Sequence, residues 1–332
     1  MKEEQIRPDV LFEEYLSLAK KDAIVYFQNS AFYHVRCPAC GNDACSFVFQ
    51  KSGFDYKECS RCKTLFVNPR PLPDAFSTYY RDAPSIKYWA SHFYKLTEKS
   101  RRELLIRPKA KMVRDIIAKS FPDFPNNSVI IDIGSGYGVF CEELQQILGG
   151  QPPVIGIEPS NDLYAVCKNK GIISVNKFFE DFSRDDIPGK QIIAATSFEL
   201  LEHLHDPDIF IKKCSEVLVP GALLILTTLN WHGFDLQVLR EKSRSIQPPA
   251  HLNFFTPDSV RRLLERHGFT IVEITIPRQR DIDIVSKQAE DVNDSFMKRL
   301  LSGNEKTEAR FQKFLQDEQL SSHMLIVAKR SE

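Results

Sequence analysis

Short apolar runs alternate with amphipathic stretches over the second half of the chain. β-branched residues dominate these runs, which is typical of strands buried on both faces of a parallel sheet. Five of the runs fall at 129–133, 153–157, 172–175, 191–196 and 222–229. Strands are also expected at 269–276 and 323–329, after a helix at 257–267 that has Pro257 in its first turn and Gly268 at its end. The alternation predicts an α/β fold with a doubly wound sheet.

The first 120 residues have a different pattern. Apolar positions recur at roughly helical spacing over residues 3–30, which predicts an N-terminal helix. Aromatic residues and a net basic stretch, 95–119 with nine Lys/Arg against three Asp/Glu, follow a cysteine-rich module. We therefore expect an N-terminal helix in 1–34, the cysteine module in 35–70, and an aromatic and basic helical linker or lid in 71–120. The α/β domain is expected in 121–332, and it contains a polar helical insert at about 280–318.

Two Cys-x-x-Cys pairs define the module at 35–70. Cys37 and Cys40 form the first pair, Cys59 and Cys62 form the second, and 18 residues separate the pairs. This spacing favours a zinc ribbon over four free thiols, because each pair can hold one side of a tetrahedral ion. Four thiolates leave no open coordination position, so the sequence predicts a structural and not a catalytic Zn²⁺.

Composition narrows the class of protein. Lys+Arg and Asp+Glu are both 44 in 332 residues, so no overall charge attracts nucleic acid or a membrane surface. No apolar run approaches the ~20 residues of a membrane helix, and the first five residues lack the apolar core of a signal peptide. We expect a cytoplasmic protein, where cysteines remain reduced and available to a metal.

A glycine-rich turn follows the first strand of the α/β domain. It begins at Asp132 and carries Gly134, Gly136 and Gly138, so the pattern is D-x-G-x-G-x-G and differs from the G-x-G-x-x-G of dinucleotide-binding proteins. Such a turn lets the backbone approach a ligand beside a helix N-terminus. The next strand ends at Glu158, whose carboxylate can accept two hydrogen bonds from a ribose.

The turn, the acid and the later motifs resemble those of class I S-adenosylmethionine-dependent methyltransferases. The resemblance implies a Rossmann-like sheet of seven strands that ends in an antiparallel hairpin, beside the small N-terminal zinc ribbon. Phe179-Glu180-Asp181-Phe182 is similar to the segment that contacts adenine in that family. The cofactor-binding residues that the resemblance implies are Asp132, Gly134, Ser135, Gly136, Gly138, Glu158, Pro159, Glu180, Asp181, Ser197 and Phe198.

The fourth strand leads into Glu199-Leu200-Leu201-Glu202-His203, followed by Asp206-Pro207, which resembles the family's E-x-L-E-H-x-x-D-P segment. Three interpretations remain open. His203 is a general base; or Glu199, Glu202, His203 and a later histidine bind Mg²⁺, as in small-RNA 2′-O-methyltransferases and some ubiquinone-pathway O-methyltransferases; or these groups only orient the loop. His251, in a segment that is similar to one facing the acceptor, is the second candidate base, and Glu202 completes the expected catalytic set.

The acceptor is the least defined part of the prediction. Its expected contacts are Glu199, Asn230, Trp231, Asn253 and Tyr80. A zinc ribbon followed by Asn68-Pro69-Arg70-Pro71 and a Tyr-Tyr pair resembles methyltransferases of polysaccharide and secondary-metabolite pathways. We expect S-adenosylmethionine-dependent methylation of a hydroxyl group on a small molecule. The expected acceptor is a sugar or secondary-metabolite intermediate, and a nucleotide-linked sugar is one candidate.

Three alternatives stay open. They are a sugar C-methyltransferase, an RNA-modifying enzyme that docks RNA with the ribbon and basic helix, and a binding module with a degenerate cofactor site. Neutral net charge disfavours RNA. The basic stretch at 95–119 is either an attractor for a phosphorylated substrate or, as we favour, a solvated helix face. The insert at 280–318 is either a homodimer contact or a cap over the site.

Overall fold

The fold is taken from a computed structural model, which describes residues 3–276 and 281–332. Residues 1 and 2 of the expected N-terminal segment, and the expected start of the insert at about 280, lie outside the described residues.

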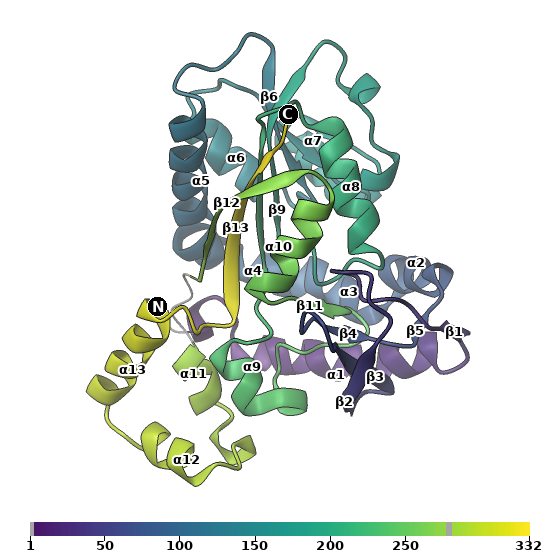
Figure 1. Ribbon diagram of the computed structural model, residues 1–332. Helices are drawn as coiled ribbons and strands as arrows, with labels where there is room; N and C mark the ends of the chain where they lie inside the picture. Colours follow the sequence, from purple (N-terminus) through teal and green to yellow (C-terminus); the bar gives the residue numbers. More distant parts are fainter. Residues whose placement is uncertain (1–2, 277–280) are drawn as a thin grey trace.

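A seven-stranded sheet in the order β12-β13-β10-β9-β6-β7-β8 forms the centre of the molecule (Figure 1). Within this sheet β13 is the reversed strand, because it pairs antiparallel with both β10 and β12. This confirms the Rossmann-like methyltransferase sheet with its terminal antiparallel pairing. The strands are β6 (Ser128–Ile133), β7 (Val154–Ile157), β8 (Ser174–Val175), β9 (Gln191–Phe198), β10 (Leu223–Leu229), β12 (Phe269–Thr275) and β13 (His323–Arg330).

Helices cover both faces of this sheet. In β6, Val129 and Ile131 face one apolar cluster with α8 (Pro207–Val217) and α10 (Pro257–Arg266), while Ile130 faces another. The second cluster contains α5 (Arg107–Ser120) and α6 (Val139–Ile147). A strand whose successive residues meet opposite layers must be apolar throughout, as the sequence of β6 is. The connections also contain α7 (Asn161–Asn169), η4 (Phe179–Asp181) and η5 (Arg184–Asp186).

The cysteine module forms a second, four-stranded sheet in the order β11-β4-β3-β2. Three of its strands are local, namely β2 (Cys45–Lys51), β3 (Phe54–Cys59) and β4 (Leu65–Val67). The fourth, β11 (Asn253–Phe254), comes from the methyltransferase domain almost two hundred residues later. A two-stranded pairing of β1 (Phe32–Tyr33) with β5 (Arg70–Pro71) borders the module. The ribbon is therefore continuous with the α/β domain at β11.

The N-terminal helix α1 (Asp9–Phe27) follows a short helix η1 (Glu3–Gln5), and Pro8 separates them. Its aromatic residues pack on the linker: Phe12 and Tyr15 lie in one apolar cluster with Phe93. The linker is helical over most of its length, as expected. It comprises α2 (Pro73–Asp82), α3 (Pro84–Tyr88), the π-helical turn η2 (Trp89–Tyr94), α4 (Lys95–Arg101), a second π-helical turn η3 (Arg102–Ile106) and α5.

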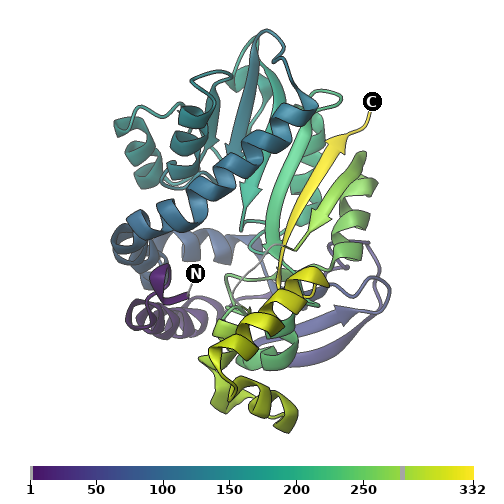
Figure 2. The same cartoon turned by 90° about the vertical axis from the view of Figure 1, so that its left-hand side faces the viewer.

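The insert contains α11 (Asp281–Ser286), η7 (Ala289–Asp291), α12 (Ser295–Leu301) and α13 (Glu305–Asp317). It packs against α9 (Phe234–Leu239), which η6 (Arg240–Lys242) follows. Figures 1 and 2 show the insert, α1 and the ribbon at the same end of the molecule, opposite the C-terminus. The carboxyl ends of the parallel strands point to this end. Within the described ranges, no helix combines the length and the apolar character that a membrane crossing requires.

Candidate active site

The glycine turn lies between β6 and α6, as predicted. Gly134, Gly136 and Gly138 all have positive φ, at 75°, 56° and 68°. A Cβ at Gly138 would meet the end of the Ile172 side chain at 2.4 Å, so a larger residue there would require a shift of that side chain besides straining a positive φ. A Cβ at Gly136 would meet nothing within 4 Å, so the backbone there faces open space. The two glycines thus have different reasons: close packing at Gly138 and ligand access at Gly136.

Asp132 lies under this turn as a buried carboxylate with 4% exposure. Its Oδ1 accepts a hydrogen bond from Thr196 Oγ1 at 2.6 Å, and the Cys141 thiol lies 3.6 Å from Oδ2. Burial raises the pKa of Asp132 to about 7, against the lowering effect of these two donors. The expected cofactor acid is thus held rigidly by β9 and α6.

Glu158 at the tip of β7 reaches back to the glycine turn. Its Oε2 accepts from the Gly136 amide at 2.8 Å, and its Oε1 accepts from the Ser160 amide at 2.9 Å. Burial raises the pKa of this carboxyl group, and the two amide donors oppose the shift. Each carboxylate oxygen has a second lone pair, so Glu158 can still accept from ribose hydroxyls while it ties the turn to β7.

The other expected cofactor residues divide into buried and exposed groups. Ser135 packs over Gly156, where a Cβ would lie 2.6 Å from the serine Oγ, and buried Ser197 donates from Oγ to the Ile133 carbonyl. These two side chains shape the strand ends from inside. Pro159, Glu180 and Asp181 are exposed. Below them Phe179 and Phe182 are buried in the core, so neither offers an open ring face to adenine.

Glu202, His203 and His251 converge, although nearly fifty residues separate the histidines. One ligand atom from each residue lies within 4.8 Å of the others. The imidazole centroids are 4.6 Å apart and cross at 71°. The Glu202 side chain is buried and its Oε2 accepts from Thr228 Oγ1 at 2.8 Å. These residues come from the β9 loop and the segment before β11, so the fold creates a cluster that the spacing alone does not show.

Hydrogen bonds set the protonation of the two imidazoles. His203 Nδ1 lies 3.0 Å from the Ala250 carbonyl, and His251 Nδ1 lies 2.7 Å from the Ser245 carbonyl. A carbonyl only accepts, so each Nδ1 carries the proton and each neutral ring has its lone pair on Nε2. Burial lowers the pKa of His203 to about 4 and that of His251 well below its ordinary value. Burial and the charge of Glu199 raise the pKa of Glu202 to about 8.

Of the expected Mg²⁺ set, Glu202 and His203 belong to this cluster, while Glu199 is not among the residues whose ligand atoms converge. It adopts a positive φ of 53°, and its Oε1 accepts from Thr227 Oγ1 at 2.6 Å. The same oxygen lies 2.8 Å from His323 Nε2, at the start of β13. The set that the structure brings together is Glu202, His203 and His251.

Three expected substrate contacts are instead buried in protein contacts. Asn230 donates to the Ser321 carbonyl, and Asn253 donates to the Leu204 carbonyl. Trp231, which is 2% exposed, donates from Nε1 to Glu58 at 3.0 Å. These three side chains therefore hold loops together, because protein groups occupy their hydrogen-bonding atoms. Tyr80 remains exposed, at 39%, beside Tyr79.

Sequence reasoning missed several side chains near the strand ends. Tyr94 of η2 stacks on Tyr137 of the glycine turn, with ring centroids 4.5 Å apart and planes 5° apart. Lys109 of α5 lies with Nζ 4.3 Å from the centroid of Phe198, the expected cofactor residue. The aromatic and basic composition of the linker was the available signal, but its register depends on the two π-helical turns. The linker therefore covers the cofactor side.

Two arginines of the basic stretch form ion pairs with glutamates of α6. Arg102 lies 2.6 Å from Glu142 and 3.0 Å from Glu143, and Arg107 lies 2.8 Å from Glu143. These pairs link the linker to α6 and support the interpretation as a helix face, because their charges are already matched within the protein.

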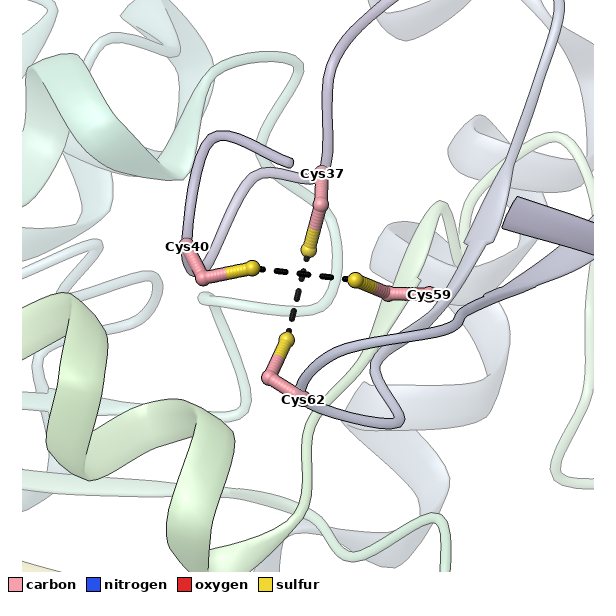
Figure 3. Close-up of side chains that lie close together, drawn as sticks. All are labelled: Cys37, Cys40, Cys59 and Cys62. Atoms are coloured by element: carbon pink, nitrogen blue, oxygen red, sulfur yellow. Dashed lines mark hydrogen bonds between the residues drawn. The ribbon is translucent and has the colours of Figure 1, made fainter. Parts of the chain in front are cut away.

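The four ribbon sulfurs point toward one another (Figure 3). Cys37 Sγ lies 3.5 Å from Cys62 Sγ, and Cys40 Sγ lies 3.6 Å from Cys59 Sγ. A tetrahedral zinc with Zn–S bonds of about 2.3 Å spaces its sulfurs roughly 3.8 Å apart. The four cysteines therefore fit this ion with only small adjustments of their side chains.

The strand order, the glycine turn and the acid at the next strand tip together define a class I methyltransferase core. Residues 102–274, just over half of the chain, match the family model described as "Methyltransferase domain". The chain belongs to this methyltransferase family.

Relatives share part of the chain. The ubiquinone biosynthesis O-methyltransferase of Bradyrhizobium diazoefficiens is 30% identical over 155 residues, which are 44% of this chain and 60% of that protein. The corresponding enzyme of Nitrobacter winogradskyi is 32% identical over 154 residues, 43% of this chain and 57% of that protein. The chain thus spans less than two thirds of the length of these relatives.

Solved structures with a similar fold include two methyltransferases. A SAM-dependent methyltransferase from Archaeoglobus fulgidus aligns with a TM-score of 0.46 and 18% identity, over 72% of this chain and 100% of that one. The plantazolicin methyltransferase BpumL, in complex with SAH, aligns with a TM-score of 0.48 and 16% identity, over 76% of this chain and 93% of that one.

Proposed function

We propose that this chain transfers a methyl group from S-adenosylmethionine to a hydroxyl group of a small molecule. The observation that carries the proposal is the open backbone at Gly136, flanked by the buried Asp132 and by Glu158 at the neighbouring strand tip. A sulfonium nucleoside fits this arrangement because the turn offers amide donors and space, and Glu158 offers acceptors for ribose. Family membership supports the same cofactor.

The reaction is an in-line displacement at the sulfonium methyl. The cofactor is already electrophilic, so orientation of the acceptor oxygen supplies much of the rate. The protein must place that oxygen beyond the tips of β9 and β10, where Glu202 and His203 stand. The exposed Tyr80 is a candidate contact for the acceptor.

Glu202, His203 and His251 are the residues that would hold a divalent cation. Their donor chemistry fits one: two neutral imidazoles with fixed Nδ1–H groups and one carboxylate, which is a common ligand combination. Such a cation lowers the pKa of a coordinated hydroxyl. The low pKa of both histidines makes them weak proton acceptors, so we favour this role over that of a histidine base.

The acceptor is proposed to be methylated at oxygen. The similarity to relatives named ubiquinone biosynthesis O-methyltransferases favours oxygen over carbon. The N-terminal ribbon and the Asn-Pro-Arg-Pro segment suggest a sugar or secondary-metabolite intermediate. The ribbon would hold a structural Zn²⁺, since all four ligands are cysteines.

Methyl transfer is tested by incubating the purified chain with S-adenosylmethionine and a panel of phenols, sugars and nucleotide sugars, with Mn²⁺, Mg²⁺ or a chelator. We expect O-methylated products by mass spectrometry, with turnover that requires an added divalent cation. Binding of S-adenosylhomocysteine without any cation dependence of turnover would retain the methyltransferase and remove the cation. Absence of S-adenosylhomocysteine binding would remove the proposed activity.

A further inference from the structure

Arg70 is a buried cation whose hydrogen bonds go to backbone and side-chain amide oxygens. Its side chain belongs to the Asn68-Pro69-Arg70-Pro71 segment and the residue is only 1% exposed. In the described part of the chain it forms no ion pair within 4.0 Å, and its hydrogen bonds go to uncharged oxygens. A buried guanidinium is costly, and burial lowers the pKa of Arg70 to about 10. A residue retained at such a cost needs a structural or functional reason.

The guanidinium joins the two segments that carry the acceptor cluster. Its Nη1 donates to the His205 carbonyl at 2.5 Å, two residues after His203. Its Nη2 donates to Asn253 Oδ1 at 3.1 Å, two residues after His251. Asn253 in turn donates from Nδ2 to the Leu204 carbonyl at 2.8 Å, which closes a second link between the segments. The third donor, Nε, anchors the side chain on the Val67 carbonyl of its own ribbon.

Other ribbon groups hold the same segment. The Tyr56 hydroxyl of β3 donates to the His251 carbonyl at 2.7 Å. The Val67 amide donates to the Leu252 carbonyl at 2.9 Å, and β4 pairs with β11 beside it. On the opposite side, the amides of Leu252 and Asn253 donate to the Glu202 carbonyl at 2.8 and 3.1 Å. Ribbon, His251 segment and Glu202 loop thus form one continuous hydrogen-bonded layer.

We propose that Arg70, assisted by Tyr56, is a positioning residue that sets the geometry of the Glu202, His203 and His251 cluster, and that the ribbon serves to hold this cluster. The inference rests on the proposed function of the cluster. Arg70 does not touch the acceptor, because it is enclosed by protein. It acts through the two peptide segments that it clamps.

Arginine suits this place because its planar fork presents donors in several fixed directions. A lysine has a single ammonium and reaches both segments less well. Against the lowering effect of burial, the neighbouring groups Tyr33, Asp206 and Cys37 raise the pKa of Arg70, so the guanidinium stays charged.

The test compares four variants of the full chain: Arg70→Met, Arg70→Lys, Tyr56→Phe and the control Phe47→Ala, which changes a 60% exposed residue on ribbon strand β2. Mn²⁺ affinity is measured by electron paramagnetic resonance, S-adenosylhomocysteine affinity by calorimetry, and protection of residues 250–256 by hydrogen exchange. Zinc content reports ribbon integrity.

We expect Arg70→Met to weaken Mn²⁺ binding by about 10- to 100-fold, which is typical for loss of a group that orients metal ligands. Arg70→Lys should restore part of the affinity, and Tyr56→Phe should cause a smaller loss. Exchange at Leu252 and Asn253 should accelerate in Arg70→Met. S-adenosylhomocysteine affinity and zinc content should stay unchanged, and Phe47→Ala should match the wild type throughout.

Unchanged Mn²⁺ affinity together with unchanged exchange in Arg70→Met would overturn the inference. If the wild type binds no Mn²⁺, the cation of the proposed function is wrong, and exchange at Leu252 and Asn253 decides the positioning role by itself. If Arg70→Met does not fold, Tyr56→Phe decides: a wild-type result for both its Mn²⁺ affinity and its exchange would contradict the inference.

Discussion

The cofactor side and the acceptor side of this site are built in different ways. The cofactor side comes largely from one continuous stretch, β6 to α6, and from the tip of the adjacent strand β7. The acceptor side combines the loop after β9 with a segment that pairs with strand β4 of the cysteine module. One side is therefore local in sequence, while the other depends on contacts between residues far apart.

This difference explains why the ribbon belongs to the fold and is more than an appended module. Its strand β4 supplies the pairing edge for β11, and its buried residues Cys37, Cys62 and Phe66 lie in the main apolar cluster with α10. A small module with four thiolates has little core of its own and needs an ion for stability. A Zn²⁺ held by these cysteines, as proposed, would therefore stabilise the acceptor side through the pairing of β4 with β11.

The largest expected effect is on the acceptor side. Glu202→Gln should reduce turnover by roughly a thousandfold, because it removes the only carboxylate of the cluster and with it several kcal/mol of charge stabilisation. Glu216→Gln is the control, since Glu216 is an exposed glutamate on α8. Steady-state kinetics at saturating cofactor measure both. Equal losses in the two variants would show that the cluster has no special role.

The next effect concerns the cofactor side alone. Gly136→Val should weaken S-adenosylhomocysteine binding by about a hundredfold, because the side chain enters the open space above the turn and strains a positive φ. Gly149→Val carries similar strain, at φ 65°, with nothing within 4 Å of its Cβ. Calorimetry should find normal binding in this control. Normal binding by Gly136→Val would place the cofactor elsewhere.

A pH dependence should separate the buried acid of the cofactor side from the rest. The pKa of Asp132 is about 7 in the folded protein against 3.8 for an ordinary aspartate, so the folded state binds more protons between these values. Stability therefore falls as pH rises through this window. The Asp132→Asn variant lacks this pH-dependent loss of stability. Its free energy of unfolding, relative to that of the wild type, should therefore increase by about 2 kcal/mol from pH 5 to pH 8.

Denaturant unfolding at both pH values measures this difference. The control is Asp185→Asn, since Asp185 is exposed in η5 and its change should leave the pH dependence at the wild-type level. A relative stability of Asp132→Asn that does not change with pH would mean that Asp132 is ionised in the folded protein at pH 5.

The smallest expected effect tests whether the linker supports the cofactor side. Tyr94→Leu should weaken S-adenosylhomocysteine binding about fivefold, because loss of the stack on Tyr137 removes ~1 kcal/mol of support for the glycine turn. Tyr88→Leu is the control, since Tyr88 stacks on the exposed His92. Fluorescence or calorimetric titration distinguishes them. Equal S-adenosylhomocysteine affinities of the two variants would show that the linker does not support the cofactor side.

Much of the fold was predictable from the sequence because its signals are local. The apolar runs gave all seven strands of the main sheet to within a few residues, and the cysteine spacing indicated the four sulfurs that converge. Gly134, Gly136 and Gly138 indicated a tight turn after the first strand, and in the structure all three have positive φ. Each of these features depends on neighbouring residues, so a single sequence carries it.

The acceptor side was predictable only in part because its geometry depends on distant segments. His203 and His251 were selected as candidates, but their convergence with Glu202 required β11 to pair with β4. Trp231 and Asn253 were expected to face an acceptor, whereas contacts with the ribbon and the β9 loop occupy them. Arg70 had no assigned role, since only the fold shows which carbonyls it reaches.

The central claim is that S-adenosylmethionine binds at the glycine turn and is held by Glu158. Calorimetric titration of the wild type and of Glu158→Ala with S-adenosylhomocysteine tests it most directly. We predict one binding site per wild-type chain and a loss of affinity of at least about tenfold in the variant, which removes a charged hydrogen-bond acceptor. No heat of binding to the wild type, or equal affinity in the two proteins, would contradict the claim.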